Sequence, residues 1–408
     1  MPTVTEGIVT GFSNLTTNKQ NIVDAIDAVD RREIPFLAML GWAMEADITK
    51  AVDSLKFPCI QAQHTWQSDS LVPSTAIITT NAHVSGSGTV KIGSGEAKYF
   101  VQDEVMVATS GNTTVHFRLT AIDTANDVLS VEIVSGSADA ALPVGTTLYS
   151  MSRPALRGET YAFAGKATTL VSDTNFCQIF GAGKEGVISV DGTEQSTESW
   201  GIDSQLDYQT AKRLAELAIK LEQASLYGLR NTTYPTQNAQ PAAMMGGLWY
   251  FMQTLSGGLS QNALGAQLSA SENYLRTLMD QIWGEGGNPS VLMMNVFNRS
   301  QMSDLLTPYV RTDRGDRGVG VVVDEYTYSH GTVAVALNKW VHPQHVWLLS
   351  PEAIGIGPLT GNGNSRAFAT EDLPKTGDFV QRAVIGEYTM EVHNRQQAHG
   401  LIKNLATS

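Results

Sequence analysis

The chain has 408 residues, of which 42% are hydrophobic and 16% are charged, and its formal net charge at pH 7 is −13. Because the sequence is acidic and has no polybasic tract, general attraction to nucleic acid or to an anionic membrane is not expected. No stretch reaches the ~18 apolar residues of a membrane span, and the N-terminus lacks the regions of a secretory signal, so we expect synthesis in the cytoplasm and no membrane partner.

The length predicts two or three folding units of about 100–200 residues each. The charged fraction lies below the roughly 25% of an average soluble domain. This composition suits a protein that hides much of its surface against other subunits. It equally suits a β-rich secreted domain, so composition alone leaves both classes open.

The N-terminal region is predicted to be a polar arm followed by a short helix. Residues 1–18 are largely polar. From Lys19 to Val29 apolar residues recur at helical spacing, which predicts a helix there. The helix should end before Pro35, because proline disfavours helical geometry at the residue that precedes it.

Residues 55–175 have β-like sequence almost throughout. The segment opens with a predicted strand over 55–69, and the Gly/Ser-rich stretch Gly86–Gly95 predicts a flexible hinge. Four β-branched runs, separated by turn signals, then predict a small sandwich or barrel. These runs are 99–108, 113–123, 128–134 and 146–152, and a further β run covers 167–180.

The period then changes to that of a long helix over Ser204–Arg230. A narrow stripe at three- and four-residue steps predicts its buried face. The stripe consists of Ala211, Leu214, Ala218, Leu221 and Ser225. Ser204 with Asp207 resembles a capping box, and Glu216 with Lys220 is an (i, i+4) pair in the favourable order.

Helices and strands mix in the remaining sequence, which predicts an α+β fold. Helices are expected over 272–284 and 298–306, and strands over 291–296, 331–337 and 345–350. The run 379–394 alternates along its length and predicts a long, half-buried strand. One face carries Val384, Tyr388, Met390 and Val392, and the other carries Ile385, Glu387, Thr389, Glu391 and His393.

Several motifs suggest a phosphate-binding, metal or catalytic site, but their residues do not have the spacing that such a site requires. Gly86–Gly95 lacks the Gly-Lys-Ser/Thr ending of a phosphate loop and precedes β-like sequence. The proline inside His342–His345 prevents a regular helix from aligning the two imidazoles, so exposed loop histidines are favoured over a metal site. Asp324 and Glu325 point to opposite faces of a strand, and no G-x-S-x-G motif is present. We assign no catalytic residue, cofactor or metal ligand, and we expect a protein that is not an enzyme.

The segment Arg311–Gly318 is the one local basic cluster in the sequence. Its three arginines stand among two aspartates and could clamp an anion. A solvated loop is the favoured interpretation. The alternative is a contact to a neighbouring subunit through Arg311, Arg314 and Arg317.

Four stretches resemble the tailed-phage major capsid (major head) proteins of the Hong Kong 97-type fold. Residues 21–41 are similar to the family's N-terminal segment, with an acidic amphipathic turn that leads into a Pro-Phe motif. Residues 64–71 resemble the start of the extended hairpin called the E-loop. Residues 286–306 resemble a strand and helix of the axial domain, and residues 372–402 the closing strand of the peripheral domain.

The resemblance implies a domain organisation for the whole chain. An N-terminal arm and helix would cover 1–54, the E-loop 55–175 with an inserted β module over 94–153, the peripheral domain 176–240 and 370–408, and the axial domain 241–369. The peripheral domain would contain a spine helix over 204–228 and the closing strand over 379–394. The acidic face of that strand would then serve subunit contacts and solvent.

The resemblance also implies a function. The protein would self-assemble into the icosahedral head shell of a tailed bacteriophage, as hexamers and pentamers that enclose double-stranded DNA without sequence-specific binding. Assembly would take place in the host bacterial cytoplasm, with a portal protein and with scaffold or decoration proteins as partners. Trp66, at the start of the hairpin, and the three arginines named above are candidate subunit contacts.

Two alternatives stay open at this point. An encapsulin-like bacterial compartment shares the fold and would be distinguished by an enzyme cargo. A β-rich hydrolase or glycan-binding protein belongs to another class and would need a convergent acid pair or an aromatic platform. Such a protein would also run as a monomer.

Two further expectations follow from the hairpin. Cys59 and Cys177 flank it, so antiparallel pairing should bring them together, and cytoplasmic assembly should keep them reduced. The segment 94–153 exceeds what a minimal family member needs. It carries three basic and seven acidic residues, and we expect it to fold independently on the outer surface of the shell.

Overall fold

The computed structural model describes residues 33–41, 59–69, 71–110, 113–136, 139–155, 157–160, 170–183, 185–197, 204–232, 236–237, 240–255, 257–268, 272–306, 325–328 and 331–407. The chain divides into two compact units. One unit is Gln67–Asp173, and the other combines Met1–Trp66 with Thr174–Ser408. Each unit is described by itself below.

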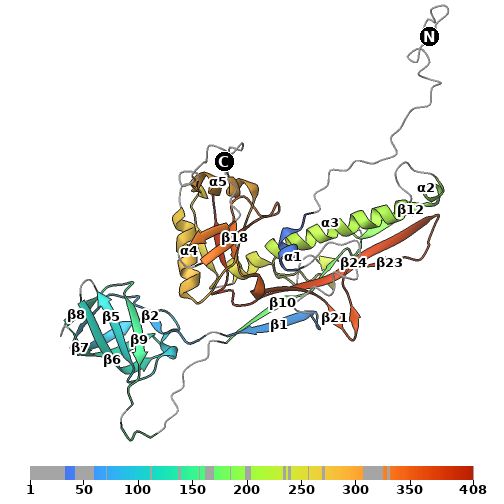
Figure 1. Cartoon of the computed structure of the whole chain (residues 1–408). Helices are drawn as coiled ribbons and strands as arrows, with labels where there is room; N and C mark the ends of the chain where they lie inside the picture. Colours follow the sequence, from blue (N-terminus) through green and yellow to red (C-terminus); the bar gives the residue numbers. More distant parts are fainter. Residues whose placement is uncertain are drawn as a thin grey trace, which may run out of the picture. The chain divides into compact units, whose positions relative to one another are not determined.

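The unit Gln67–Asp173 is built on one eight-stranded sheet, in the order β2-β9-β5-β6-β7-β4-β3-β8 (Figure 1). The strands are β2 (Thr75–Ile77), β3 (Ala82–Ser85), β4 (Ser87–Lys91), β5 (Val105–Ser110), β6 (Thr113–Asp123), β7 (Val128–Ser135), β8 (Asp139–Leu142) and β9 (Thr147–Ser152). Every pairing between them is antiparallel. Inward-facing residues of these strands form a hydrophobic core of their own, which includes Met106, Phe117, Leu129 and Leu148.

The four β runs predicted in this unit are confirmed as β5, β6, β7 and β9, whereas the predicted hinge at Gly86–Gly95 is wrong. Gly86 lies at a positive φ of 69° and makes the tight turn between β3 and β4. The Gly/Ser-rich sequence after it is strand β4, whose Val90 is fully buried. The sheet therefore begins at Thr75 rather than near residue 94.

In the larger unit, the long helix α3 (Gln205–Tyr227) packs against a five-stranded sheet centred on β24 (Phe379–Val392). The sheet also contains β11 (Gln178–Phe180), β12 (Val187–Asp191), β20 (Ile354–Pro358) and β23 (Ala369–Asp372), each antiparallel to β24. Figure 1 shows α3 running alongside β12 and β24. The predicted spine helix and closing strand are thus both present as elements.

Helix α3 begins at the predicted capping residue, but its surface ion pairs differ from the predicted one. The Ser204 hydroxyl accepts a hydrogen bond from the Asp207 backbone N–H at 3.3 Å, which caps the helix. Of the predicted stripe, Ala218, Leu221 and Ser225 are buried and Ala211 is exposed. The predicted Glu216–Lys220 pair is wrong, because Glu216 pairs with Arg213 one turn earlier and Lys220 pairs with Glu185.

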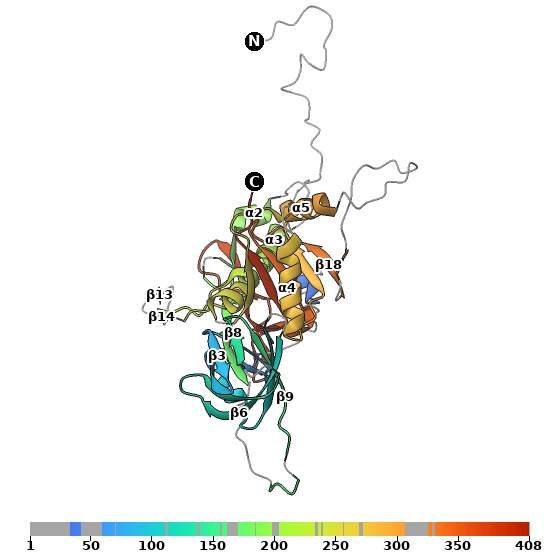
Figure 2. The ribbon, with the colours of Figure 1, turned by 90° about the vertical axis from the view of Figure 1, so that its left-hand side faces the viewer.

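A second sheet in the same unit has six strands in the order β15-β25-β19-β16-β18-β17. They are β15 (Leu259–Asn262), β16 (Val291–Met294), β17 (Glu325–Tyr328), β18 (Gly331–Leu337), β19 (Val346–Leu349) and β25 (Gly400–Lys403). Helices α4 (Glu272–Gly284) and α5 (Val296–Leu306) share its lobe (Figure 2). The predicted helices and strands of this region are confirmed.

The boundary predicted between residues 369 and 370 does not separate the two sheets, because each sheet contains a strand from the other side of it. Strand β20 precedes that boundary and pairs with β24. Strand β25 follows it and pairs with β15 and β19 in the six-stranded sheet. The C-terminus therefore returns to the second sheet, which local sequence patterns did not indicate.

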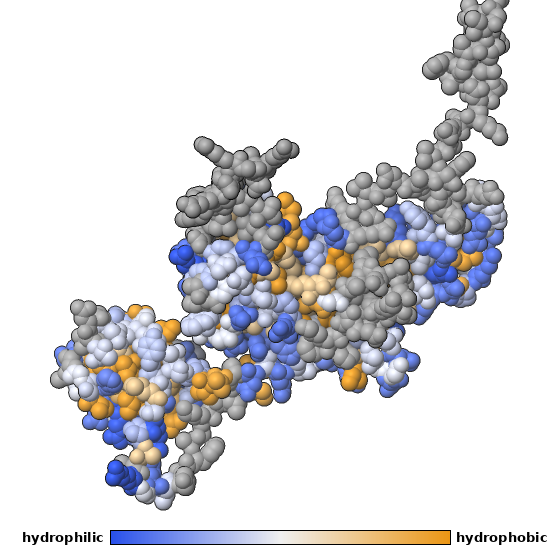
Figure 3. Space-filling view, viewed as in Figure 1, coloured by the Kyte–Doolittle hydropathy of each residue, from blue (hydrophilic) through white to orange (hydrophobic). Residues whose placement is uncertain are grey.

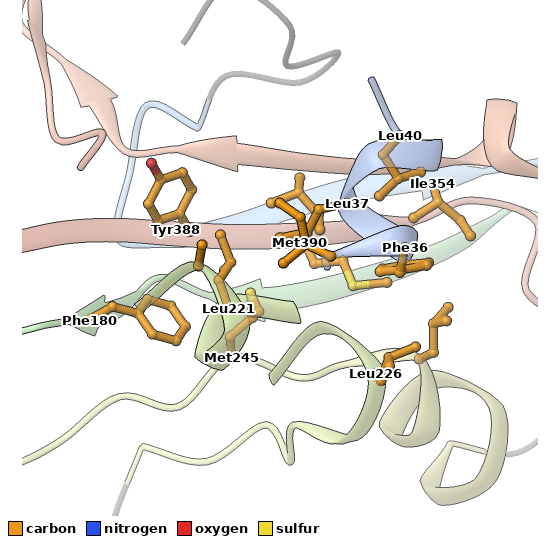
Figure 4. Packing of buried hydrophobic residues seen from close by; sticks show 14 of the residues in the cluster. Phe36, Leu37, Leu40, Phe180, Leu221, Leu226, Met245, Ile354, Tyr388 and Met390 are labelled. Carbon is orange, nitrogen blue, oxygen red and sulfur yellow. The ribbon is translucent and has the colours of Figure 1, made fainter. Parts of the chain in front are cut away.

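Helix α1 (Pro35–Met39) closes the main core, with proline at its first turn, where the missing N–H costs no hydrogen bond. Figure 4 shows Phe36, Leu37 and Leu40 packed with Met390 of β24, Ile354 of β20 and residues of α3. The helix predicted over Lys19–Val29 lies outside the described residues.

The remaining elements are short. They are β1 (Gln63–Ser68), η2 (Ala97–Tyr99), β10 (Val171–Phe176), α2 (Gly192–Ser196), β13 (Thr236–Gln237), β14 (Gln240–Pro241), η3 (Tyr250–Thr254), η6 (Pro351–Ala353), β21 (Thr360–Gly361) and β22 (Asn364–Ser365). Within the described ranges, no helix combines the length and apolar character needed to cross a membrane.

Candidate assembly surface and its buried support

Strands β1 and β10 carry the chain out of the larger unit and back into it. They pair with each other as a two-stranded sheet. The hydroxyls of Thr65 and Thr174 lie 3.2 Å apart across the pair, and the Cys177 N–H donates to the Ala62 carbonyl at 2.9 Å. The arrangement is the paired base expected of a long hairpin.

Trp66 anchors β1 inside the larger unit. Its side chain is 6% exposed. The indole Nε1–H donates to the Val392 carbonyl at 3.2 Å, and the ring lies 5.5 Å from that of Phe251. This burial argues against Trp66 as a subunit contact, and its observed role is to hold β1 against β24.

The acidic face of β24 is buried over residues 387–392. The prediction that this face would remain open to solvent and to neighbouring subunits is therefore wrong for these residues. Glu391 is 5% exposed and bonds to His64 of β1 and, at 2.9 Å, to Nε2 of His393. The Thr389 hydroxyl donates to the Phe176 carbonyl of β10 at 3.2 Å. Segments distant in sequence therefore cover this face.

Arginines hold the outer part of the same sheet. Arg382 on β24 donates to Asp372 on β23 and to Asp207 on α3, both at 2.8 Å. These ion pairs raise the pKa of Arg382, and hydrogen bonds from Ser204 and Arg382 lower the pKa of Asp207. The pairs connect helix, central strand and edge strand. Glu387 is bonded similarly by Arg366, at 2.7 Å.

Exposed apolar side chains gather on one face of the unit Gln67–Asp173. Thr75 pairs with Tyr149, and Ile77 with Thr147, so Ile77, Tyr149 and Met151 stand on the same side of β2 and β9. These three side chains are 52–62% exposed. Figure 3 shows apolar surface, in orange, on the visible side of this unit.

A shallow depression of about 470 Å³ borders this face. Its lining has no charged residue and consists of Thr109, Ser110, Pro143, Val144, Gly145, Thr146, Thr147 and Tyr149. An uncharged, partly apolar surface on an acidic chain is typical of a protein contact. The sequence offered one signal for it, since the alternation in residues 146–152 places Tyr149 and Met151 on one side.

The predicted loop histidines differ from each other. His342 is exposed as expected, and His345 is buried, which corrects the prediction for that residue. The His345 ring lies 4.7 Å from that of Trp249, and its Nδ1 lies 3.1 Å from the Tyr227 hydroxyl. Desolvation by burial lowers the pKa of His345 to about 4. Among the residues described, no cluster of three potential metal ligands was found.

The arginine cluster of the sequence, with Arg311, Arg314 and Arg317, lies outside the described residues, as does Asp324.

Acid should destabilise the subunit through His399, by about 3 kcal/mol at pH 4. This imidazole is fully buried, and burial lowers its pKa from 6.5 to about 4. Because the folded pKa lies below the unfolded value, the stability is complete above pH 6.5 and is lost as the pH falls toward 4. His345 acts in the same direction.

Denaturant melts of the native chain and of His399→Asn, at several pH values between about 4 and 7, test this expectation. Asparagine keeps an acceptor for the Ser350 N–H, which donates to His399 Nδ1 at 3.3 Å, but it does not titrate. The variant should lose stability less steeply, by up to about 1.4 kcal/mol per pH unit. Equal slopes would show that His399 is not the titrating group.

Two comparisons with known proteins, against family models and against solved structures, gave matches. A model of the SU10 major capsid protein family matches residues 5–406. A chain of the cyanophage A-1(L) capsid is similar in structure, with a TM-score of 0.53, 11% identity and coverage of 98% of this chain and 100% of that one. No match was found among curated proteins.

Two other structures are less similar. One, from Mycobacterium phage Adephagia, has a TM-score of 0.46 and 10% identity, with 98% of this chain and 99% of that chain covered. The other is the holo-SrpI encapsulin complex of Synechococcus elongatus, with a TM-score of 0.38, 10% identity and coverage of 59% and 79%.

The family model spans nearly the whole chain, so it accounts for both units described above. The mixed helix and strand content and the likeness to the cyanophage capsid chain fit a Hong Kong 97-like fold. The predicted function is therefore confirmed in its main statement. The chain belongs to the SU10 major capsid protein family, and it is a structural subunit of a phage head shell, located in the virion capsid.

Proposed function

We propose that the subunit assembles into a closed icosahedral shell of hexamers and pentamers, encloses double-stranded DNA and performs no catalysis. The observation that carries this proposal is the capsid family match over residues 5–406. That match also favours a phage head over an encapsulin-like compartment and over a β-rich hydrolase or glycan-binding protein. Many modest contacts for each subunit would stabilise such a shell through multivalency.

The charge of the chain supports enclosure of DNA without sequence-specific binding. A net charge of −13 disfavours strong attraction to phosphates. A lining that repels the duplex weakly would let it move during packaging. A portal protein and scaffold or decoration proteins are the further partners in this proposal, together with subunit contacts through Arg311, Arg314 and Arg317.

Expression of the chain with its neighbouring genes should produce large particles or capsomer oligomers. Size-exclusion chromatography and electron microscopy would detect them, and nuclease treatment of purified particles would test for protected DNA. A monodisperse monomer at high concentration, with no particles under co-expression, would contradict the proposal. A co-purifying enzyme cargo without DNA would favour the encapsulin-like alternative.

We also propose that β1 and β10 form the base of the E-loop, and that the unit Gln67–Asp173 is a module inserted into it and displayed outside the shell. The module has its own sheet and its own core. Its excess of acidic residues makes a poor lining for a DNA cavity. The uncharged face around Ile77, Tyr149 and Met151 would contact a neighbouring subunit. Helix α3 with the β24 sheet would form the peripheral domain, and the six-stranded sheet the axial domain.

Replacing residues 75–152 by a short Gly/Ser linker should leave the rest of the subunit folded. The module core and the two cores of the larger unit are separate clusters, so we expect the larger unit to keep its own packing. The melting temperature of the remainder should change by less than about 5 °C. Calorimetry and near-UV circular dichroism would measure this. A variant that cannot fold, or a particle reconstruction with the module on the inner surface, would contradict the proposal.

A further inference from the structure

Two free thiols face each other at the base of the β1–β10 pair. The sulfur atoms of Cys59 and Cys177 lie 3.3 Å apart, although the residues are 118 positions apart in the chain. Both side chains also point at the Gln61 carbonyl, at 2.7 and 3.5 Å. The predicted proximity of the two cysteines is confirmed, and both are reduced in the structure.

The backbone holds both cysteines in place. The Cys59 N–H donates to the Pro358 carbonyl at 3.2 Å, and the Cys59 carbonyl accepts from the Thr360 N–H at 2.6 Å. The Cys177 N–H donates to the Ala62 carbonyl. To form a disulfide, the sulfurs, now 3.3 Å apart, need to approach by only about 1.3 Å.

The pair has one reactive member. The hydrogen bond from Cys177 lowers the pKa of Cys59 to about 7, and nearby His64 acts in the same direction. The same interaction, with burial, raises the pKa of Cys177. At neutral pH, a substantial fraction of Cys59 is therefore in the thiolate form, which is the form that attacks a disulfide. Cys177 keeps its proton until that attack is complete.

We propose that Cys59 and Cys177 are a disulfide-forming site that stays reduced during cytoplasmic assembly and closes when the particle meets an oxidising medium. The oxidant is a small-molecule disulfide. The Cys59 thiolate attacks it, forms a mixed disulfide and releases one small thiol. Cys177 then loses its proton, and its sulfur attacks the Cys59 sulfur and releases the second. Two protein thiols are oxidised, and one small disulfide is reduced to two thiols.

The location of the two cysteines determines both how an oxidant reaches them and what a disulfide between them would constrain. The two cysteines are 0% and 3% exposed, but residues 60–63 above them are exposed, so opening of that short segment admits a small oxidant. The bond would close a chain loop that contains the whole unit Gln67–Asp173. It would restrict the unfolded chain and fasten the ends of β1 and β10 to each other.

The test treats the purified full chain with oxidised glutathione or with a non-thiol reductant, followed by intact mass and non-reducing peptide mapping. The expected result is a loss of two hydrogens, a Cys59–Cys177 cross-linked peptide and a melting temperature higher by at least about 5 °C. The double variant with serine at both positions should show no shift. Because the readout is made on the subunit, it does not depend on whether particles form.

The single variants separate the roles of the two thiols. Cys177→Ser should accumulate glutathione on Cys59, since no second thiol resolves the mixed disulfide. Cys59→Ser should react at least about tenfold more slowly at Cys177. The proposal is overturned if both thiols of the folded native chain stay free while the urea-unfolded chain oxidises, or if the bond forms and lowers the melting temperature. Equal reaction rates in the two single variants would also overturn it.

Discussion

Replacing Glu222 by alanine should lower the free energy of unfolding by about 5 kcal/mol, because three buried donors would lose their acceptor. The Glu222 side chain is fully buried. Its Oε1 accepts from the Phe36 N–H at 2.9 Å and from Asn338 Nδ2 at 2.6 Å. Its Oε2 accepts from the Leu37 N–H at 2.8 Å. The carboxylate thus joins α3 to the first turn of α1 and to the end of β18.

The variant Glu222→Gln distinguishes the contribution of the negative charge to stability from that of the hydrogen bonds. Burial raises the pKa of Glu222, and the three hydrogen bonds oppose that shift. Glu222→Gln removes the cost of burying a charge but turns an amide N–H toward one of the donors. We expect a loss of about 2 kcal/mol, less than for alanine. Urea melts at neutral pH would measure both variants.

Glu216 supplies the matched control, since it lies on the same helix and pairs at the surface with Arg213 at 2.6 Å. Glu216→Ala should cost less than about 1 kcal/mol. If Glu216→Ala and Glu222→Ala melted alike, Glu222 would not be the connection between α1 and α3. A loss of α1 alone would appear as a local increase in hydrogen exchange at Phe36 and Leu37.

Glu222 also marks a limit of sequence reasoning on α3. The helical period identified Ala218, Leu221 and Ser225 as buried, because small and apolar residues at that spacing define a face. A glutamate beside that stripe is normally expected in solvent. What buries it is a segment 185 positions away in sequence, and no local pattern carries that information.

Strand β24 is a second case in which the local sequence pattern did not reveal what covers a face. Its alternation predicted β24 correctly as a strand, together with its apolar face. Alternation also implies that the polar face meets water, and here β1 and β10 cover it instead, with His64 against Glu391. The strands that cover this face, β1 and β10, form a two-stranded sheet with each other. The polar face is therefore explained by a topology that is known only once distant strands are paired.

In the unit Gln67–Asp173, the length of each strand decided whether the sequence pattern could reveal it. The runs that became β5, β6, β7 and β9 have six to eleven residues, enough for a visible pattern. The strands missed, β2, β3, β4 and β8, have three to five residues. Short strands that contain Gly and Ser resemble linkers, and long-range pairing alone identifies them.

The helix face that the sequence did identify can be tested directly. Ala218→Asp should lower the free energy of unfolding by about 4 kcal/mol, because it places a carboxylate in the main core without a partner. Ala218 is 2% exposed and belongs to the same cluster as Leu217 and Leu221. At low pH the new carboxyl would be protonated, so the loss should shrink as the pH falls below the raised pKa of the buried acid.

Lys220→Asp is the control, two residues further along the same helix. The Lys220 side chain is 48% exposed and pairs with Glu185 at the surface, so the substitution replaces a weak attraction by a weak repulsion. We expect a cost below about 1 kcal/mol, reduced further by salt. Denaturant melts of the two variants under one condition compare them. Similar losses would mean that α3 presents a different face to β24.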